Sequence, residues 1–340
     1  MPQKVRTLTL LSFSMIAIAG SVTLMRAAKP AAAVVSAERV DVSALWRDPT
    51  DIASRSLYFG AGGEADQPHA PYTFVEEDMD GSNAKYVVRD RDNVKWTVKI
   101  GMEARPENAA TRLVWAAGYF TNEDYFLPVM QIAEMPAKVK RGQKMIGPGG
   151  TVTNARLKRH LSDEKNVGNW EWDGVFAGTR ELNGLKVMMA LINNWDLKDV
   201  NNKIYSEKGS KDQIYMVSDL GASFGATALS YPFSRSKDNL QEYEQSEFIL
   251  RMMPDAIDFA TPHHPSWEYA GHPRSFIQRT HLDTIVHNIP RDDARWIGEV
   301  LAKLSNDQIR DAFRASGYSD AEVNGFSQVV EARIAQLKSL

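Results

Sequence analysis

The chain has 340 residues, of which 43% are hydrophobic and 24% charged, with 22 Gly, 15 Pro and no Cys. These values are ordinary for a soluble globular protein and exclude collagen-like, disulfide-scaffold and wholly disordered chains. The absence of Cys also excludes thiol catalysis, Cys-bound zinc and disulfides. The formal charge of −3 gives no reason to expect a nucleic-acid partner, so none is predicted.

Residues 1–33 differ in composition from the rest of the chain. They hold four basic and no acidic residues, so their removal would change the formal charge from −3 to −7. An apolar or small-residue stretch, 8–25, is followed by an Ala-rich run, the order typical of a secretory signal peptide. The alternative is an uncleaved membrane anchor through residues 8–25, which are nearly long enough to span a bilayer. Both alternatives predict an extracytoplasmic location, periplasmic or secreted.

The next segments predict a small sheet followed by one helix. Residues 34–71 have mixed composition and are expected to form an irregular N-terminal extension. Aromatic and β-branched runs at 72–75, 86–88 and 96–100 are separated by turn sequences, which predicts an antiparallel meander. A helix is expected from Pro106 to Gly118, because Pro is favoured in the first helical turn.

The remainder of the chain predicts further strands and then mostly helices. The expected strands are 125–132, 151–157 and 213–218, and the expected helices are 179–194, 292–304, 306–316 and 320–340. Ser305 and Ser319 are expected to cap the last two helices. The predicted class is α+β, with a sheet-rich lobe at 72–135 and a mostly helical lobe at 136–340.

Lys99 and Glu107 carry the first chemical pattern. Lys99 lies near the end of an apolar strand, where an ammonium can hold the phosphates of a nucleotide. Glu107 follows eight residues later in the first turn of the expected helix and can pair with it. Glu103 competes for this role only if the helix begins earlier than Pro106. Taken separately, Lys99 fits an amphipathic strand and Glu107 a favourable helix-dipole position.

The second pattern follows the apolar helix at 179–194. Asp196 and Asn201 have the D-x-x-x-x-N spacing of a kinase catalytic loop, in which the Asp accepts a proton and the Asn binds Mg²⁺. Asp219 leaves a short apolar strand in Asp219-Leu220-Gly221, which predicts a second Mg²⁺ ligand. Asn202 beside Asn201 leaves the first ligand open by one position.

Together these positions resemble the HipA and phosphatidylinositol-kinase branch of the protein-kinase-like fold. The run Gly81-Ser82-Asn83-Ala84-Lys85 is similar to the short phosphate loop of that branch. Its helix pattern matches Glu107-x4-Arg112-Leu113-x4-Gly118, and its catalytic loop matches Asn194-x-Asp196-x4-Asn201. One departure is Leu197-Lys198, where HipA-like members usually carry Asp-His.

This resemblance implies a bilobal atypical kinase that uses ATP and Mg²⁺ and phosphorylates a hydroxyl of a protein, lipid or sugar. Lys99, Glu107 and Asp196 would be catalytic, and Asn201 and Asp219 would bind Mg²⁺. The nucleotide would be bound by Lys99 and by the phosphate loop, residues Gly81, Ser82, Asn83, Ala84 and Lys85.

Two other functions remain open from the sequence. The same scaffold can bind a ligand without catalysis, as a pseudokinase does. Alternatively, Gly221-x-Ser223-x-Gly225 after a strand suggests a serine hydrolase with Ser223 as the nucleophile. In that case His264, His281 or His287 and Asp283 or Asp292 would complete a triad. The His residues form no H-E-x-x-H motif, so a metal-dependent hydrolase is not predicted.

Overall fold

Five strands of the first half of the chain form a small closed barrel. The computed structural model describes residues 40–81, 83–161, 164–207, 209, 212–225, 236–262 and 282–340. Within Val40–Leu340, a compact unit, the strands are β1 (Tyr72–Asp78), β2 (Lys85–Arg89), β3 (Lys95–Ile100), β4 (Asp124–Ala133), β5 (Thr151–Arg159), β6 (Glu164–Gly168), β7 (Asn202–Glu207), β8 (Gln213–Val217), β9 (Ile249–Met252), β10 (Ala256–Phe259) and β11 (Ile289–Pro290). The barrel order is β1-β2-β3-β5-β4.

The barrel contains the predicted meander and goes beyond it. β1, β2 and β3 pair antiparallel in sequence order, and the predicted strands at 125–132 and 151–157 are also present as β4 and β5. β5 pairs with both β3 and β4, so the sheet extends past the expected lobe boundary at residue 135. A short parallel pairing of β1 with β4 then closes the barrel, which no local sequence signal predicts. Its interior is filled by side chains such as Tyr86, Val98 and Leu157.

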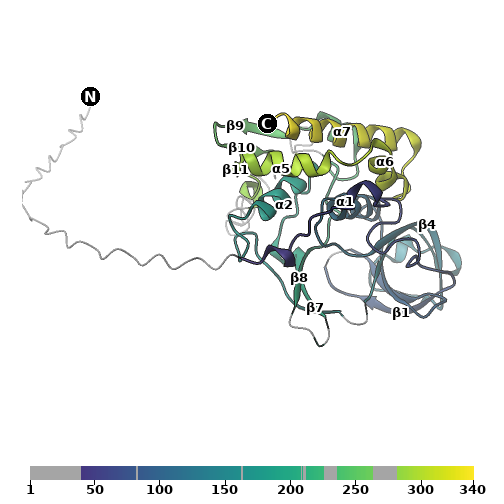
Figure 1. Cartoon of the computed structure of the whole chain (residues 1–340). Coiled ribbons are helices and arrows are strands. Elements are labelled where there is room, and N and C mark those ends of the chain that lie inside the picture. The colour runs from purple at the N-terminus through teal and green to yellow at the C-terminus, as the bar shows by residue number, and fades with distance from the viewer. Residues whose placement is uncertain are drawn as a thin grey trace, which may run out of the picture. The chain divides into compact units, whose positions relative to one another are not determined.

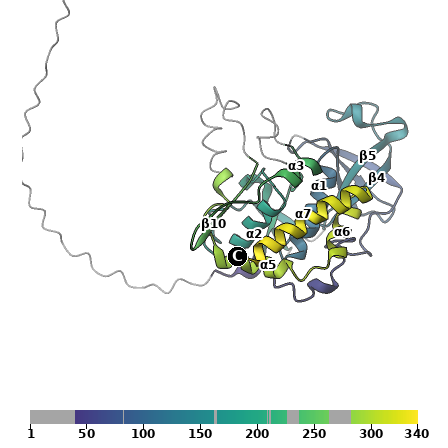
Figure 2. The same cartoon turned by 90° about the horizontal axis from the view of Figure 1, so that it is seen from above.

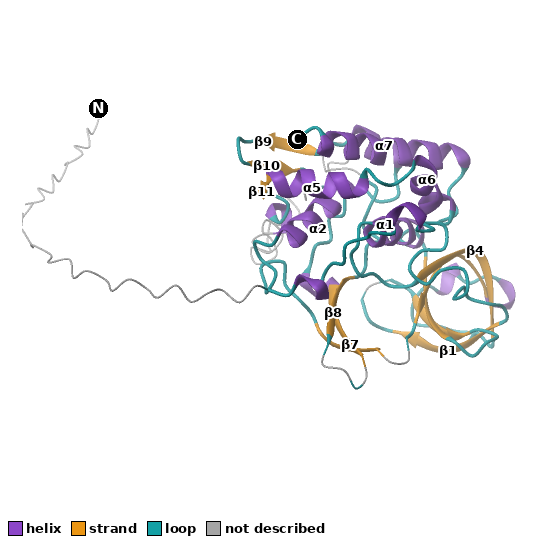
Figure 3. Cartoon of the chain, viewed as in Figure 1, coloured by secondary structure: helices purple, strands orange, loops and turns teal. Residues whose placement is uncertain are grey.

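The described helices form the other half of the structure (Figure 1). They are α1 (Ala104–Ala116), α2 (Arg180–Leu191), α3 (Leu240–Gln245), α5 (Arg291–Leu301), α6 (Asn306–Arg314) and α7 (Asp320–Lys338). Ser305 and Ser319 cap α6 and α7 through full capping boxes, as predicted. Figure 3 also shows strands in this half, which contains the three-stranded sheets β6-β7-β8 and β11-β10-β9. Of these strands the sequence indicated only β8, because β6 and β7 are mostly polar and β9, β10 and β11 are very short.

Helix α1 begins at Ala104, two residues before the predicted start. Pro106 therefore lies inside the first turn, where its missing N–H needs no helical partner. This earlier start matters because it makes Glu103 the N-cap residue, next to Lys99. The expectation that the helix starts at Pro106, which argued against Glu103 as a partner of Lys99, was wrong.

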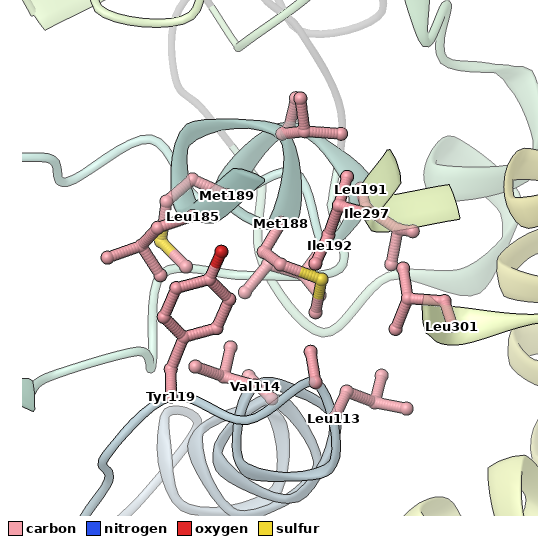
Figure 4. Packing of buried hydrophobic residues seen from close by; sticks show 14 of the residues in the cluster. Leu113, Val114, Tyr119, Leu185, Met188, Met189, Leu191, Ile192, Ile297 and Leu301 are labelled. Atoms are coloured by element: carbon pink, nitrogen blue, oxygen red, sulfur yellow. The ribbon is translucent and has the colours of Figure 1, made fainter. Parts of the chain in front are cut away.

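A large apolar core joins α1 to the helical half. Figure 4 shows Leu113 and Val114 of α1 beside Leu185 and Met188 of α2, with Ile297 of α5 nearby. All of these side chains are buried. In Figure 1, α1 lies next to the barrel, and it contacts β4 and β5 there. This single helix therefore links the barrel to the helical core.

The N-terminal extension is more ordered than its composition suggested. Its described part, from residue 40, contains two short 3₁₀ helices, Val42–Ala44 and Ile52–Ser54, and buries Leu45 and Leu57 against the core. The predicted signal or anchor, residues 1–33, lies outside the described residues. In the part of the chain that the structure describes, no helix combines the length and the apolar character needed to cross a membrane.

Candidate active site

Lys99 is the centre of a buried ionic cluster. Its residue is only 3% exposed, on β3, and its Nζ lies 2.8 Å from Glu107 Oε2 and 2.6 Å from Asp219 Oδ1. The structure thus brings Asp219, 120 residues further along the chain, to the Lys99–Glu107 pair. Burial alone would lower the pKa of the Lys99 ammonium, but the carboxylates around it outweigh this and raise its pKa above the ordinary value. Lys99 is therefore a charged amine held inside the protein.

Glu107 is shared between two cations. It is 1% exposed on α1, and its Oε1 lies 2.5 Å from Arg156 Nη2 on β5. Arg156 also lies 3.5 Å from Asp124, which in turn accepts a hydrogen bond from Thr111. Sequence reasoning missed Arg156 and Asp124; a charged Arg between Ala155 and Leu157 in a strand was the only available signal. The pairing of β3 with β5 sets Arg156 opposite Lys99.

Glu103 is a second carboxylate beside Lys99. Its Oε2 lies 3.2 Å from Lys99 Nζ and accepts a hydrogen bond of 2.5 Å from Asn83 Nδ2. Its other oxygen forms an ion pair with Lys237. Glu103 therefore joins the β1–β2 turn, β3 and residue 237, and the sequence did not assign it this position.

The predicted phosphate loop lies in the turn between β1 and β2, and only part of it reaches the site. Gly81 and Lys85 line the cleft described below, and Asn83 binds Glu103. Ala84 does not line the cleft: its side chain is buried in the barrel, since it starts the inward alternation of β2. Its backbone oxygen instead accepts a hydrogen bond from Ile100. Ser82 lies outside the described residues.

Asp196 and Asn201 contact one another in the loop after α2. Asn201 Nδ2 donates to the backbone oxygen of Asp196 at 2.7 Å and to its Oδ2 at 3.2 Å. The other carboxylate oxygen of Asp196 lies 2.6 Å from Lys198 Nζ. Lys198, which departed from the family pattern, therefore provides a cation that fixes the orientation of Asp196.

Strand pairing brings Asn201 next to Asp219. Asn202 is opposite Val217 in the β7–β8 pair, and Ser218 donates its N–H to the oxygen of Asn201 at 3.1 Å. Asp219 has a left-handed backbone, with φ of 58°, and its side chain is 43% exposed. Burial opposes ionisation of this carboxyl, but the charge and hydrogen bond of Lys99 prevail and hold its pKa below the usual value. Asp219 is therefore an ionised and accessible oxygen donor.

Lys99, Glu107, Arg156, Asn201 and Asp219 line a cleft of about 430 Å³. Asp196 does not line this cleft; it lines a smaller hollow that shares Asn201 and Asp219 with it. Five basic residues line the cleft, which are Lys85, Lys99, Arg156, Lys158 and Lys203, together with four acidic ones, Asp78, Asp80, Glu107 and Asp219, so basic residues are in slight excess. A second hollow of about 380 Å³ shares Lys158 and Tyr205 with this cleft, so the two adjoin. A polyanion such as a nucleotide phosphate chain suits such a surface, because it would meet preplaced positive charge.

Comparison with known proteins finds similar solved structures but no matching family. No family model and no curated protein matches this chain. Three similar solved structures are of kinases. A proinflammatory kinase of Helicobacter pylori, CtkA, is 10% identical, with a TM-score of 0.44 over 78% of this chain and 96% of that one. The Golgi casein kinase is 12% identical, with a TM-score of 0.33 over 84% and 78% of the two chains. Its Mn/ADP-bound form gives 0.32 at 12% identity over 79% and 75%.

The donor atoms fit a magnesium ion that is shared with a substrate. Among the described residues, no group of three or more His, Cys, Asp or Glu side chains is arranged to hold a metal. Asn201 and Asp219 offer one amide and one carboxylate oxygen, because the Asn201 NH₂ is directed to Asp196. Such hard oxygens suit Mg²⁺, which commonly takes one or two protein ligands and completes its shell with phosphate oxygens and water.

The serine-hydrolase hypothesis fails on burial. Ser223 is 0% exposed, and its hydroxyl accepts a hydrogen bond from Asn194 Nδ2 at 3.2 Å inside the core. A nucleophile elbow needs an exposed hydroxyl at the end of a strand. His264 and His281 lie outside the described residues. Ser223 instead contributes to the support of the loop that carries Asp196.

Proposed function

We propose that this chain is an extracytoplasmic kinase-like enzyme that transfers the γ-phosphoryl group of ATP to a hydroxyl acceptor. One observation carries the proposal: the buried Lys99 ammonium is paired with Glu107 of α1 and with Asp219, and all three residues line a cleft that other basic side chains also line. Phosphoryl transfer depends on an ion pair of this kind, because the Lys must be held in place to bind phosphate oxygens.

The remaining residues have separate tasks. Lys99 and Lys85 bind phosphate oxygens, and the β1–β2 turn covers them. Asn201 and Asp219 would hold Mg²⁺, which when bound neutralises charge on the transferred phosphoryl group. Glu107 touches no substrate; it keeps Lys99 oriented, and Arg156 in turn orients Glu107.

Asp196 acts on the acceptor. Its carboxylate hydrogen-bonds the acceptor hydroxyl and takes its proton as the new O–P bond forms. The bond between the γ-phosphorus and the β–γ bridging oxygen breaks, and ADP leaves with that electron pair. Asn201 and Lys198 hold the Asp196 carboxylate in one orientation, so little reorganisation is needed at this step. The acceptor class is a protein, lipid or sugar hydroxyl.

The location is part of the proposal and is inferred from residues 1–33 alone. Their basic start, apolar stretch 8–25 and Ala-rich end would direct export, with cleavage or with retention as a membrane tether. An alkaline phosphatase fusion after residue 40 tests this: activity in cells is expected only if the segment is exported, and an inactive fusion contradicts the location.

A binding protein without catalysis is the second candidate, and one observation favours it. Lys99 already forms ion pairs with three carboxylates, Glu103, Glu107 and Asp219, and donates hydrogen bonds to the first and the last of them. The Lys99 ammonium can bind a phosphate group only when one of these carboxylates moves away from it. Such a satisfied cluster is stable without nucleotide and would suit a purely structural core.

Mg–ATP binding by the full chain tests the proposal. We expect Mg–ATP at saturating concentration to raise the Tm by about 3–5 °C, since ligand at 100 times Kd stabilises by about 2.7 kcal/mol. Lys99→Ala and Asp219→Ala should abolish this shift, whereas Lys95→Ala, a more exposed lysine on the same strand, should retain it. Absence of a shift at millimolar Mg–ATP would contradict the proposal. A shift without ADP release would favour the binding protein.

A further inference from the structure

Helix α1 is held on two sides, and only one side is the active site. Glu107 and Thr111 face the barrel, where they bind Arg156 and Asp124. Arg105, Asn108 and Arg112 follow the three- and four-residue spacing of another helix face. Figures 1 and 2 place α6 and α7 near α1, and the contacts of this second face lead there and to the N-terminal extension.

Asn108 is completely buried and uses both ends of its amide. Its Nδ2 donates to Ser316 Oγ at 2.8 Å and to the backbone oxygen of Ala315 at 3.2 Å, at the C-terminal end of α6. Its Oδ1 accepts a hydrogen bond of 2.6 Å from Arg112. A shift of α1 would leave these buried polar atoms without partners, which costs roughly 1–3 kcal/mol for each group.

Arg105 connects the start of α1 to the start of α7. Its Nη2 lies 2.6 Å from Glu322 Oε1, and its guanidinium lies 3.9 Å from the centre of the Tyr318 ring. Asp238 completes the cluster, at 3.5 Å from Arg105 and as acceptor of the Tyr318 hydroxyl at 2.7 Å. Arg105 thus has ionic, hydrogen-bonding and cation–π contacts only two residues before Glu107.

The other end of α1 is fixed by the N-terminal extension. Trp46 donates to the oxygen of Ala117 at 2.7 Å, and Arg55 donates to that of Trp115 at 2.6 Å. Arg112 reaches back to the oxygen of Tyr58. The Trp46 bond thus satisfies the carbonyl that follows the last helical turn, and Arg55 adds a donor to the Trp115 carbonyl, which also accepts from the Gly118 N–H. The helix is therefore anchored along its whole length.

We propose that Arg105 and Asn108 are positioning residues, through which α6 and α7 hold α1 and keep Glu107 paired with Lys99. The inference rests on the proposed function. In protein kinases the Lys–Glu pair must be in place, and the position of its helix is a point of control. Here the helix is built into the core, so the pair is formed in the resting protein and needs no activating partner.

The experiment compares Arg105→Ala, Arg105→Lys and Asn108→Ala with Arg314→Ala. Arg314 forms an exposed ion pair with Asp311 on α6 and is the matched control. Hydrogen exchange of the α1 amides is measured without nucleotide, so it does not depend on activity. ADP release from Mg–ATP is measured in the parent and in a Glu107→Gln background. Arg105 variants keep the test informative if Asn108→Ala does not fold, because Arg105 is partly exposed.

We expect Arg105→Ala to speed α1 exchange and lower kcat about tenfold, as loss of about 1.4 kcal/mol implies. Arg105→Lys should restore part of the rate, and Arg314→Ala should match the parent. In the Glu107→Gln background Arg105→Ala should change kcat by about twofold or less, because both changes act through one pair. An equal loss in both backgrounds, or unchanged exchange, would overturn the inference. If the parent neither binds nor cleaves ATP, the proposed function is wrong, and exchange alone decides this inference.

Discussion

The buried charges of the site alternate in sign from one side chain to the next. Asp124, Arg156, Glu107, Lys99 and Asp219 follow one another within ion-pair distance. Burying a charge is costly unless it is paired, so each of these groups offsets the free-energy cost of burying its neighbour. Asp219, at the open end, is the most exposed of them and is the one best placed to exchange Lys99 for another ligand.

Asp196→Asn tests the assignment of the base. The substitution keeps the shape of the side chain but removes its ability to take a proton, so kcat for phosphoryl transfer or ADP release should fall about 100-fold or more. The Kd for Mg–ATP, measured by calorimetry, should stay within about twofold, because Asp196 contacts the acceptor. Asp307→Asn, at an exposed position of α6, is the control. Unchanged turnover would remove Asp196 from the mechanism.

At the scale of elements, the β1–β2 turn is held in place by a loop far along the chain. Arg141 donates to the backbone oxygens of Met79, Asp80 and Gly81. Its own carbonyl accepts a hydrogen bond from the Tyr86 hydroxyl at 2.6 Å. We call these hydrogen bonds of Arg141 the clamp. The clamp orders the β1–β2 turn, whose own sequence, with a single described glycine, does not fix its conformation.

Arg141→Ala should weaken nucleotide binding without unfolding the barrel. With the clamp removed, the turn must be ordered by the ligand itself, and we expect the Kd for Mg–ATP to rise about three- to tenfold. Lys144→Ala, an exposed lysine in the same loop, should leave the Kd unchanged and serves as the control. Equal affinity of the Arg141 variant and the parent would show that the turn does not contribute to nucleotide binding.

For the molecule as a whole, α1 and its ionic contacts join the barrel to the helical half. Glu103 at the N-cap binds Lys237, and Arg105 binds Glu322 at the start of α7. The apolar side of α1 is part of the helical core, whereas Glu107 belongs to the cluster with β3 and β5. The contacts of α1 therefore determine both the relative placement of the two halves and the geometry of the site.

The Arg105–Glu322 contact should make stability depend on pH in a defined direction. Burial raises the pKa of the Glu322 carboxyl, but the hydrogen bonds from Arg105 and Ser319 outweigh it, so the pKa lies below its ordinary value of 4.5. The stabilisation is thus fully present above pH 4.5 and is lost as the pH falls through the lower pKa of the folded state.

Glu322→Gln measures this contribution, because Gln also suits the capping box of α7. We expect the variant to unfold about 1–2 °C below the parent at neutral pH, since a partly exposed ion pair contributes about 1 kcal/mol or less. The difference should shrink as the pH is lowered below 4.5. A difference that stays constant down to pH 3 would mean that the charge of Glu322 does not matter.

Short-range sequence signals determined most of the elements and half of the site. Capping boxes at Ser305 and Ser319, the alternating strands and the eight-residue step from Lys99 to Glu107 each act within one or two turns of chain, where local geometry decides the outcome. The same holds for Asp196 and Asn201, which are joined within one loop. These features were predictable because their partners are near in sequence.

Only the tertiary structure decided the rest. The pairing of β5 with β3 placed Arg156 beside Glu107, and the early start of α1 added Glu103 to the site. The tertiary structure also buries Ser223, which the G-x-S-x-G motif alone had indicated as a nucleophile. Burial and long-range ion pairs depend on which surfaces pack together, and a local sequence pattern does not indicate which surfaces these are. The sequence by itself therefore indicated the candidate groups Lys99, Glu107, Asp196, Asn201 and Asp219, whereas the packing of α1 between barrel and helices decided which of them meet and which further charged residues join them.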